Sequence, residues 1–360
     1  MERIERLLEV DENPHFSPSR LASMATCPKQ GWFNYVLRYK DFNVPSYVTL
    51  GSFLHKKIEK IWVSPEKDGI WLPGYKSREK CLSIAKRDWK FRYAGRDENG
   101  QVKTSEGHPI EWFEKDNEGY GLLWRVEKSM GLAYDREIAE GPWAAAELPV
   151  KVEFKGIKLY CKIDALWERP GGGIIIEDHK SGSEPVGEYF VRHNQQLSIN
   201  SMSVFEALQR KHTYLSRIFP KYAGISLNEF LDPGFLQVQI HDINPRKDKE
   251  KSEVYSSSRT EHDFNEVIAS AGAARKSLIE RDFHANKGHS CDICFFRKVC
   301  NDYHPEEYYK DEFSRRYPLF AGLEDDALVS DNPKINTGKQ KPRQSSFRFN
   351  PARKPKSSGH

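Results

Sequence analysis

The stretch IIIEDHKSG, residues 174–182, decides the fold of this chain and raises its main question. Three isoleucines predict a strand inside a hydrophobic core, yet four ionisable residues, beginning with Glu177, follow them at once. Side chains alternate along a strand, so Asp178 and Lys180 share one face and His179 points to the other. Either the strand simply reaches the surface here, or the chain places charge beside a hydrophobic wall. In both cases we expect Glu177 to be exposed.

A second carboxylate belongs to the preceding predicted strand. Asp164 lies in IKLYCKIDALWE (157–168), which a Gly-rich turn joins to GGIIIEDHKSG (172–182). Antiparallel pairing across this turn would bring Asp164 beside Asp178. The segment AELPVKVEF (146–154) precedes them as a third strand. The sequence therefore predicts three antiparallel strands with two aspartates at one point of the sheet.

Helices are predicted on both sides of these strands. The first begins with Ser17 as its N-cap and Pro18 at the first helical position. Periodicity predicts further helices over 50–62, 77–94, 120–138, 189–210 and 261–283, and a fourth strand over 234–243. This order of elements predicts an α/β fold, a mixed central sheet flanked by helices.

Two carboxylates grouped with a lysine suit the cleavage of phosphodiesters. Asp164 and Asp178 would supply hard oxygen ligands for Mg²⁺ or Mn²⁺, and such a metal acidifies a bound water. Lys180 would orient that water or stabilise the developing charge. Two carboxylates this close are costly without a cation. The alternative is an ordinary Asp–Lys pair at a strand end, and these residues by themselves leave it open.

The spacing KIDAL…IIIEDHKSG is similar to the Asp…(Asp/Glu)-x-Lys signature of the PD-(D/E)XK nuclease superfamily. It resembles more narrowly the RecB-like branch, whose strands read G-x-ID-R…DYKTG, and Asp164, Asp178 and Lys180 fall on the matching positions. The resemblance implies a restriction-endonuclease-like core with helical insertions. It also implies a metal-dependent deoxyribonuclease, an exonuclease rather than an endonuclease, which acts at single-stranded DNA ends in recombination, repair or phage DNA processing.

The resemblance also assigns the metal ligands of this branch to residues of this sequence. His55, four residues after Gly51 in GSFLHKKIE, matches a histidine ligand near the start of the domain. The resemblance implies that it binds Mg²⁺ or Mn²⁺ together with Asp164, Asp178 and the backbone carbonyl of His179.

Two further positions of the branch have matches here. Glu147 in AAELPVKVEF stands where the branch has a supporting active-site glutamate. Gln196 in NQQLSINSM matches the glutamine that begins the helix after the lysine, with Gln195 as an adjacent competitor. The tyrosine of the family pattern Gln-x3-Tyr is replaced by Asn200, so this sequence departs from the pattern there.

The cysteines indicate a second kind of metal site. Cys291, Cys294 and Cys300 have the spacing C-x2-C-x5-C, and Cys27 in ATCPKQGWFNY is the natural fourth ligand. Four thiolates are compatible with zinc or with an iron–sulfur cluster. The segment SPSRLASMATCPKQGWFNYVLRY (17–39) resembles that of the iron–sulfur RecB-like nucleases, which include the AddB nuclease domain and CRISPR-associated exonucleases. The resemblance implies a [4Fe–4S] cluster with a structural role, and zinc is the alternative.

Composition sets limits on the class of protein. The 360 residues are 38% hydrophobic and 30% charged, with a net charge of +4 and a mean hydropathy of −0.73. No stretch reaches the about 18 apolar residues of a membrane span, and the N-terminus does not read as a secretory signal. We therefore expect a cytoplasmic protein of a bacterial or phage-infected cell. A phosphate-binding GxxxxGK[ST] loop is absent, which excludes a helicase of that type.

A single nuclease domain is predicted over 1–310. Its predicted parts are a core at 15–63, 144–205 and 285–302, with insertions at 64–140 and 207–284. A linker at 311–330 and a disordered basic tail at 331–360 would follow, since the last thirty residues hold eight Lys and Arg and little to bury. The expected partners are DNA with free or single-stranded ends, and a helicase, recombinase or single-strand-binding protein. The alternative function is a non-catalytic DNA-binding or partner-docking module that keeps the fold and the cluster.

Overall fold

The computed structural model describes most of the chain up to Cys300. The described residues are 14–37, 39, 44–63, 72–94, 102–104, 110–112, 119, 121–181, 186–210, 213–244, 252–286, 291, 294–296 and 300. The predicted linker and basic tail lie outside the described residues.

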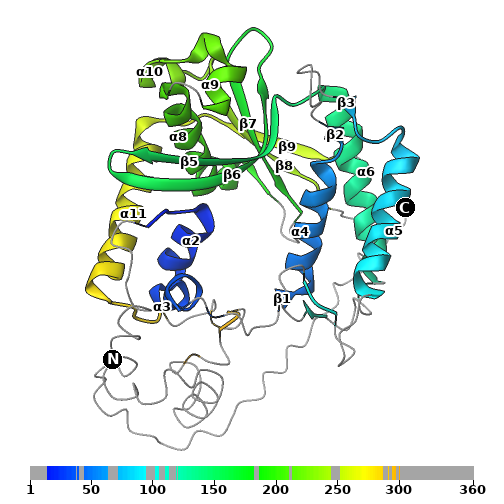
Figure 1. Cartoon of the computed structure of the whole chain (residues 1–360), viewed down its shortest axis with the longest axis horizontal. Coiled ribbons are helices and arrows are strands. Elements are labelled where there is room, and N and C mark those ends of the chain that lie inside the picture. The colour runs from blue at the N-terminus through cyan, green and yellow to red at the C-terminus, as the bar shows by residue number, and fades with distance from the viewer. Residues whose placement is uncertain are drawn as a thin grey trace, which may run out of the picture.

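A five-stranded mixed sheet forms the centre of the fold (Figure 1). The strand order is β5-β6-β7-β8-β9, and every neighbouring pair is antiparallel except β7 and β8, which are parallel. The strands are β5 (Ala145–Phe154), β6 (Ile157–Glu168), β7 (Ile174–Lys180), β8 (Leu236–Asp242) and β9 (Glu253–Ser257). The predicted β5–β6 hairpin is confirmed, and both turn residues, Lys155 and Gly156, have the positive φ of a tight hairpin turn.

Helices cover both faces of this sheet. On one face lie α2 (Pro18–Thr26), α8 (Gln195–Gln209) and α11 (Glu261–Glu280), and on the other α4 (Ser46–Ile58), α5 (Arg78–Ala94) and α6 (Leu123–Glu140) (Figure 1). Two hydrophobic clusters fill the layers, one containing Leu166 and Ile176 and one containing Trp167 and Ile175. The alternation of these neighbours along β6 and β7 explains why the isoleucine run is buried on both sides. The predicted α/β fold is confirmed.

Short elements complete the chain. They are α3 (Pro28–Gly31), a π-helical turn (Trp32–Val36), α7 (Glu188–Arg192), α9 (Tyr214–Ile218), a 3₁₀ turn (Pro220–Tyr222), α10 (Leu227–Phe230), and the two-residue strands β1 (Val44–Pro45), β2 (Trp62–Val63), β3 (Leu72–Pro73) and β4 (Ile110–Glu111). As predicted, Ser17 caps α2, because its hydroxyl accepts a hydrogen bond from the Arg20 N–H at 3.2 Å. None of the described helices is both long and apolar enough to cross a membrane.

Two expectations about the second half of the chain are corrected. The single helix predicted over 189–210 is two helices, because Asn194 leaves the helical path and caps α8 by accepting a hydrogen bond from the Leu197 N–H at 3.0 Å. The segment 207–284, predicted as an insertion, supplies β8 directly beside β7. It therefore contributes to the central sheet as well as to the periphery.

Candidate active site

The side chains of β5 and β6 switch from one face of the sheet to the other at the same point. β5 and β6 pair regularly on either side of the position where Glu147 lies opposite Asp164, but not at that position. Ile163 packs in the cluster on the α8 side, whereas Ala165 packs in the cluster on the α4 side. Glu147 adopts a left-handed φ of 48°, a conformation that costs a non-glycine residue about 1–2 kcal/mol. This irregularity lets both carboxylates reach α4.

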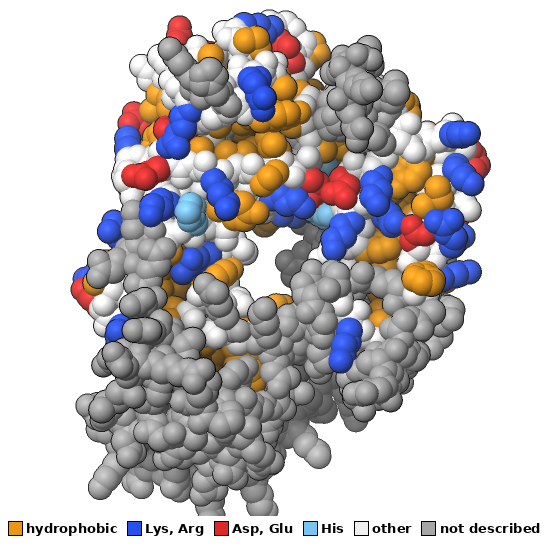
Figure 2. Space-filling model, viewed as in Figure 1, with side chains coloured by type: hydrophobic (Ala, Val, Ile, Leu, Met, Phe, Trp, Pro, Cys, Tyr) orange, Lys and Arg blue, Asp and Glu red, His pale blue; other side chains and the backbone are white. Residues whose placement is uncertain are grey.

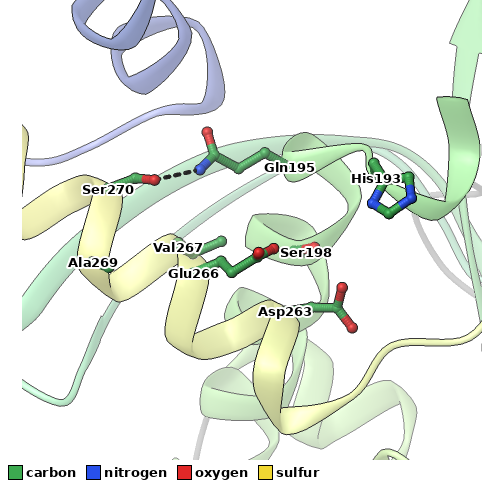
Figure 3. A pocket seen from close by; sticks show the side chains of 8 residues that line it. All are labelled: His193, Gln195, Ser198, Asp263, Glu266, Val267, Ala269 and Ser270. Atoms are coloured by element: carbon green, nitrogen blue, oxygen red, sulfur yellow. Dashed lines mark hydrogen bonds between the residues drawn. The ribbon is translucent and has the colours of Figure 1, made fainter.

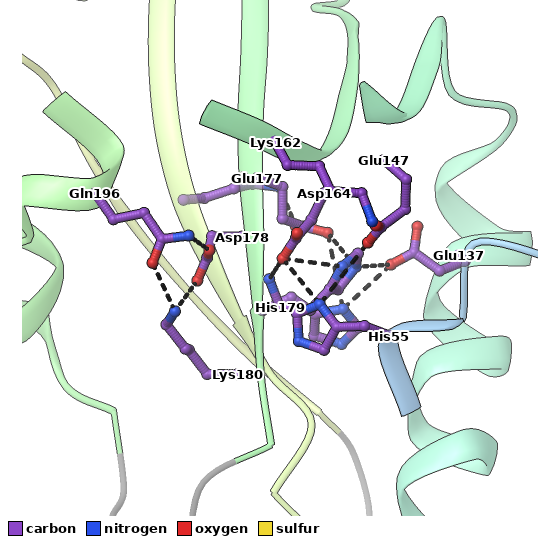
Figure 4. A network of polar contacts seen from close by, with 12 residues as sticks. His55, Glu137, Glu147, Lys162, Asp164, Glu177, Asp178, His179, Lys180 and Gln196 are labelled. Carbon is purple, nitrogen blue, oxygen red and sulfur yellow. Dashed lines mark hydrogen bonds and ion pairs between the residues drawn. The ribbon is translucent and has the colours of Figure 1, made fainter. Parts of the chain in front are cut away.

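On α4 these carboxylates meet His55 (Figure 4). The His55 Nδ1 atom lies 3.4 Å from Asp164 Oδ2 and 3.9 Å from Glu147 Oε1. Glu147 also forms an ion pair with Lys162. We call His55, Glu147 and Asp164 the strand-end group, because their ligand atoms all lie within 4.8 Å of one another. Carboxylate oxygens are ligands that suit Mn²⁺ or Mg²⁺, and the softer imidazole nitrogen favours Mn²⁺ of the two.

Asp178 lies across the strands from Asp164. The last antiparallel pair of β6 and β7 is Ala165–Glu177, so the two aspartates are opposite each other one step beyond it. Asp178 Oδ1 accepts a hydrogen bond of 2.5 Å from Gln196 Nε2, and Asp178 Oδ2 lies 2.7 Å from the Lys180 ammonium. β6 and β7 are not paired at this position, so no backbone ladder joins the two aspartates.

The helix α8 supplies the glutamine of this arrangement. The Lys180 ammonium donates a hydrogen bond of 3.0 Å to Gln196 Oε1, so Gln196 bonds both Lys180 and Asp178 (Figure 4). Gln195 instead donates a hydrogen bond of 2.9 Å to the Ser270 hydroxyl on α11 (Figure 3). Of the two candidate glutamines, Gln196 is therefore the one that lies beside the aspartates.

The two aspartates differ in their electrostatic surroundings. Burial opposes ionisation of Asp164, but His55 and the His179 N–H lower the pKa of this carboxyl well below its usual range. Burial raises the pKa of Asp178, although Lys180 partly counters it. Burial also opposes the charge on Lys180, yet the adjacent Asp178 raises the pKa of this ammonium, which therefore keeps its proton. A divalent cation near Asp178 would offset the burial that disfavours its charge.

A second set of ionisable residues lies behind the strand-end group, and the sequence did not predict it. We call Glu137, Glu177, His179 and His241 the buried group, because all four side chains are almost completely buried. The His179 Nε2 atom lies 3.4 Å from Glu137 Oε1 and 3.2 Å from Glu177 Oε1. The His241 Nδ1 atom lies 3.1 Å from Glu137 Oε1. The Arg136 guanidinium donates to both carboxylates at 2.9 Å.

The expectation that Glu177 is exposed was wrong. Its side chain is 0% exposed, because Arg136 of α6 donates a hydrogen bond of 2.9 Å to Glu177 Oε1 and Gln239 of the neighbouring strand β8 donates one of 2.6 Å to Glu177 Oε2. Glu137 Oε2 accepts a comparable bond of 2.7 Å from the Trp143 indole. Every carboxylate oxygen of the buried group therefore has a donor.

One residue, His179, connects the buried group to the strand-end group through its backbone N–H and its ring. The His179 N–H donates a hydrogen bond of 2.9 Å to Asp164 Oδ2, while the His179 ring is held by Glu137 and Glu177 on the other side. Burial alone would lower the pKa of His179, but these two carboxylates raise it to about 10. The proposed role of the His179 carbonyl as a metal ligand stays a prediction.

The four proposed cluster cysteines lie near one another at the far end of α2. Burial and, to a smaller extent, the nearby thiols of Cys300, Cys27 and Cys291 raise the pKa of Cys294 to about 11. Backbone contacts join the two segments, since the Lys29 N–H donates to the carbonyl of His284 at 3.2 Å.

Aromatic packing supports this junction. Trp32, Phe33 and Tyr39 form a small hydrophobic cluster with Phe296, against which Cys294 and Cys300 pack. The rings of Phe33 and Phe296 are stacked with their centroids 5.3 Å apart. These aromatic side chains therefore belong to the packed interior of the protein.

Comparison with known proteins assigns the chain to a family. A family model described as the PD-(D/E)XK nuclease superfamily matches residues 15–301. No curated protein sequence matches the chain. Similar solved structures include a candidate exonuclease from Eubacterium rectale, 10% identical, with a TM-score of 0.39, covering 80% of this chain and 89% of that one. Another is the protein SSO0001, 12% identical, with a TM-score of 0.32, covering 71% of this chain and 98% of that one.

The match covers the site as well as the fold. Its range, residues 15–301, contains the mixed sheet, the flanking helices and the residues of the strand-end group. The predicted restriction-endonuclease-like architecture is thereby confirmed. Since the family model spans most of the chain, this protein belongs to the PD-(D/E)XK nuclease superfamily.

Proposed function

We propose that this protein is a metal-dependent DNA nuclease of the RecB-like branch, an exonuclease that hydrolyses phosphodiester bonds at single-stranded ends. The observation that carries the proposal is the convergence of side chains from five elements on one end of β7 (Figure 4). The side chains are His55 of α4, Glu147 of β5, Asp164 of β6, Asp178 and Lys180 of β7, and Gln196 of α8.

The donor set fits a divalent metal. A bound Mg²⁺ or Mn²⁺ would supply Lewis acidity and a water of lowered pKa. His55, Glu147 and Asp164 would hold it, with Asp178 as a further oxygen ligand across the strands. Asp164 stays ionised because His55 and the His179 N–H lower its pKa, so it is ready to bind a cation.

Lys180 and Gln196 have separate tasks in this proposal. The protonated Lys180 ammonium would donate a hydrogen bond to the attacking water or to a phosphate oxygen, and so stabilise the negative charge of the transition state. Gln196 positions both Lys180 and Asp178, since its amide bonds each of them. Asp178 keeps the ammonium close to the site at 2.7 Å.

The test is cleavage of end-labelled single-stranded and duplex DNA with Mg²⁺ or Mn²⁺. Wild type should release mononucleotides or short products from single-stranded ends, and circular single-stranded DNA should resist. The substitutions Asp178→Ala and Lys180→Ala should each lower the rate by about 100-fold or more.

A matched control lies on the same sheet. Glu168 at the exposed end of β6 forms an ion pair with Lys221, and Glu168→Gln should leave the rate within about twofold of wild type. If wild type cuts no DNA with either metal, the non-catalytic module replaces this proposal. Cleavage of the circle would instead indicate an endonuclease.

We also propose that Cys27, Cys291, Cys294 and Cys300 hold a [4Fe–4S] cluster. The mutual proximity of the thiols around Cys294 supports it, and a metal at this position would join the N-terminal helices to the chain beyond α11. No redox step is needed for hydrolysis, so the role would be structural. Anaerobically purified protein should be brown and carry four irons per chain, and a colourless zinc protein would contradict the cluster.

The nuclease would act in recombination, repair or phage DNA processing. A free single-stranded end arises when a duplex is unwound or resected. The expected partner is therefore a helicase, a recombinase or a single-strand-binding protein. Co-purification of the protein from cells with damaged DNA would test this partnership. If none of the three classes of protein co-purifies, the proposed partnership is contradicted.

A further inference from the structure

One exposed aromatic side chain lines the active-site pocket, and a second exposed aromatic side chain precedes it in the sequence. This pocket has a volume of about 580 Å³, and its lining includes Asp164, Lys180 and Gln196 together with Phe190 of α7. Phe190 is 46% exposed, and its neighbour Tyr189 is 79% exposed. Large apolar rings at the mouth of a polar site are a typical sign of a binding surface.

The helix that carries these rings is firmly anchored. Val191, which follows Phe190 in the sequence, is fully buried. The buried Arg259 guanidinium donates hydrogen bonds to the carbonyls of Val191 at 2.8 Å and Asn194 at 3.2 Å, and so fixes the connection between α7 and α8. The backbone that carries the rings is therefore fixed before any ligand binds, which lowers the entropy lost on binding.

Tyr189 is further restrained by its own helix. Its ring lies against the His193 ring, with the centroids 4.5 Å apart and the planes tilted by 48°. The pair leaves most of the tyrosine exposed to solvent, so a flat face is available for stacking.

Charge distinguishes this pocket from a second one nearby. The active-site pocket includes the cations Lys162 and Lys180 in its lining. The second pocket, about 420 Å³ between α8 and α11, is lined instead by Asp263 and Glu266 (Figure 3). Acidic walls repel phosphate groups, so of these two pockets the first suits a nucleic acid strand better.

Figure 2 shows Lys and Arg side chains along the band that crosses the middle of the molecule, together with hydrophobic, acidic and histidine side chains. A groove that combines cations with aromatic rings is the arrangement that proteins use for unpaired nucleic acid strands.

We infer that Phe190, with Tyr189 beside it on α7, forms a base-stacking platform that holds unpaired nucleotides beside the phosphodiester to be cleaved, an inference that rests on the proposed nuclease function. Bases inside a duplex already stack on each other, so the rings can stack only on bases of a single strand or a frayed end. The platform would thus make the site selective for single-stranded substrate without reading its sequence.

The test measures binding without cleavage. Fluorescence anisotropy in EDTA compares labelled oligo-dT with a blunt hairpin duplex of equal length. Phe190→Ala should weaken the binding of oligo-dT by about tenfold or more and leave the hairpin unchanged, whereas Phe190→Trp should retain the affinity. Phe91 on α5 is 80% exposed and outside this pocket, so Phe91→Ala is the matched control and should bind like wild type.

Each outcome decides between the two proposals. If Phe190→Ala and Phe91→Ala bind oligo-dT equally well, the platform is wrong, even where wild type cleaves DNA. If Phe190→Ala weakens the hairpin as much as oligo-dT, selectivity for unpaired bases is wrong. If wild type cleaves nothing but Phe190→Ala loses affinity for oligo-dT alone, the platform stands and the nuclease proposal fails.

Discussion

Two groups of acidic and histidine residues flank the His179 peptide, and they differ in how their charges are satisfied. In the buried group, the guanidinium of Arg136 and the protonated ring of His179 balance the carboxylates of Glu137 and Glu177. The strand-end group opens into a pocket and keeps a surplus of carboxylate. Residue type alone therefore does not identify a metal site, whereas access and unbalanced negative charge do.

The neutral balance of the buried group assigns it a supporting role. It fixes the ring of His179 and thereby the N–H that bonds Asp164. Such outer contacts orient the residues that bind a metal. We therefore regard Glu137 as a positioning residue, although it lies on a helix in a segment that the sequence assigned to an insertion.

The largest expected effect follows from removing the cation of the buried group. Arg136→Met would leave two buried carboxylates short of a partner, and should lower the free energy of unfolding by about 3–5 kcal/mol. Urea titration measures it. Arg78 forms an exposed ion pair with Asp135 at 2.7 Å, and Arg78→Met should cost less than about 1 kcal/mol. Equal losses for the two substitutions would contradict the charge balance described above.

The second prediction separates activity from stability. Asp178→Asn should lower the cleavage rate by about 100-fold or more, yet it should leave the free energy of unfolding nearly unchanged. The reason is that burial already disfavours the charged form of Asp178 by raising its pKa. Parallel measurement of cleavage and urea unfolding checks it. A large loss of stability would mean that Asp178 is chiefly structural.

The third prediction concerns pH. The pKa of His179 is raised to about 10 in the folded chain, against about 6.5 when unfolded. Its contribution to stability is therefore complete below pH 6.5 and is lost as the pH rises toward 10. In chelator-treated protein the stability should fall by about 1.4 kcal/mol per pH unit in this window from this residue. Glu137→Gln should flatten the slope, and an unchanged slope would contradict the assignment.

The smallest expected effect concerns Gln196. Its amide bonds both Asp178 and Lys180, so Gln196→Ala should lower cleavage by about tenfold, as expected for the loss of positioning bonds. Gln195→Ala, which removes only the bond to Ser270, is the matched control and should keep the wild-type rate. A larger effect for Gln195→Ala would reverse the assignment of the two glutamines.

Much of the fold could be predicted from local signals. The period-2 pattern and the Gly-rich turn placed Asp164 opposite Asp178, since hairpin register follows from the turn. The break before α8 carried a signal as well, because Asn194 is a good N-cap. The helical periodicity continues on both sides of Asn194, and for this reason the sequence was predicted to form one helix.

The buried group could not be predicted in the same way. Glu137 lies forty residues before Glu177 in the sequence, and only the tertiary packing of α6 against β7 and β8 brings them together. Strand alternation indicated that Glu177 and His179 share a face, but not that β8 and α6 would bury it. Local periodicity carries no information about which helix covers which strand.

Titration with Mn²⁺, followed by electron paramagnetic resonance of the free ion, tests the central claim most directly. Wild type should bind Mn²⁺, Asp164→Asn should lose most of this binding, and His241→Gln in the buried group should retain it. Binding that survives Asp164→Asn but disappears in His241→Gln would place the metal in the buried group and contradict the account.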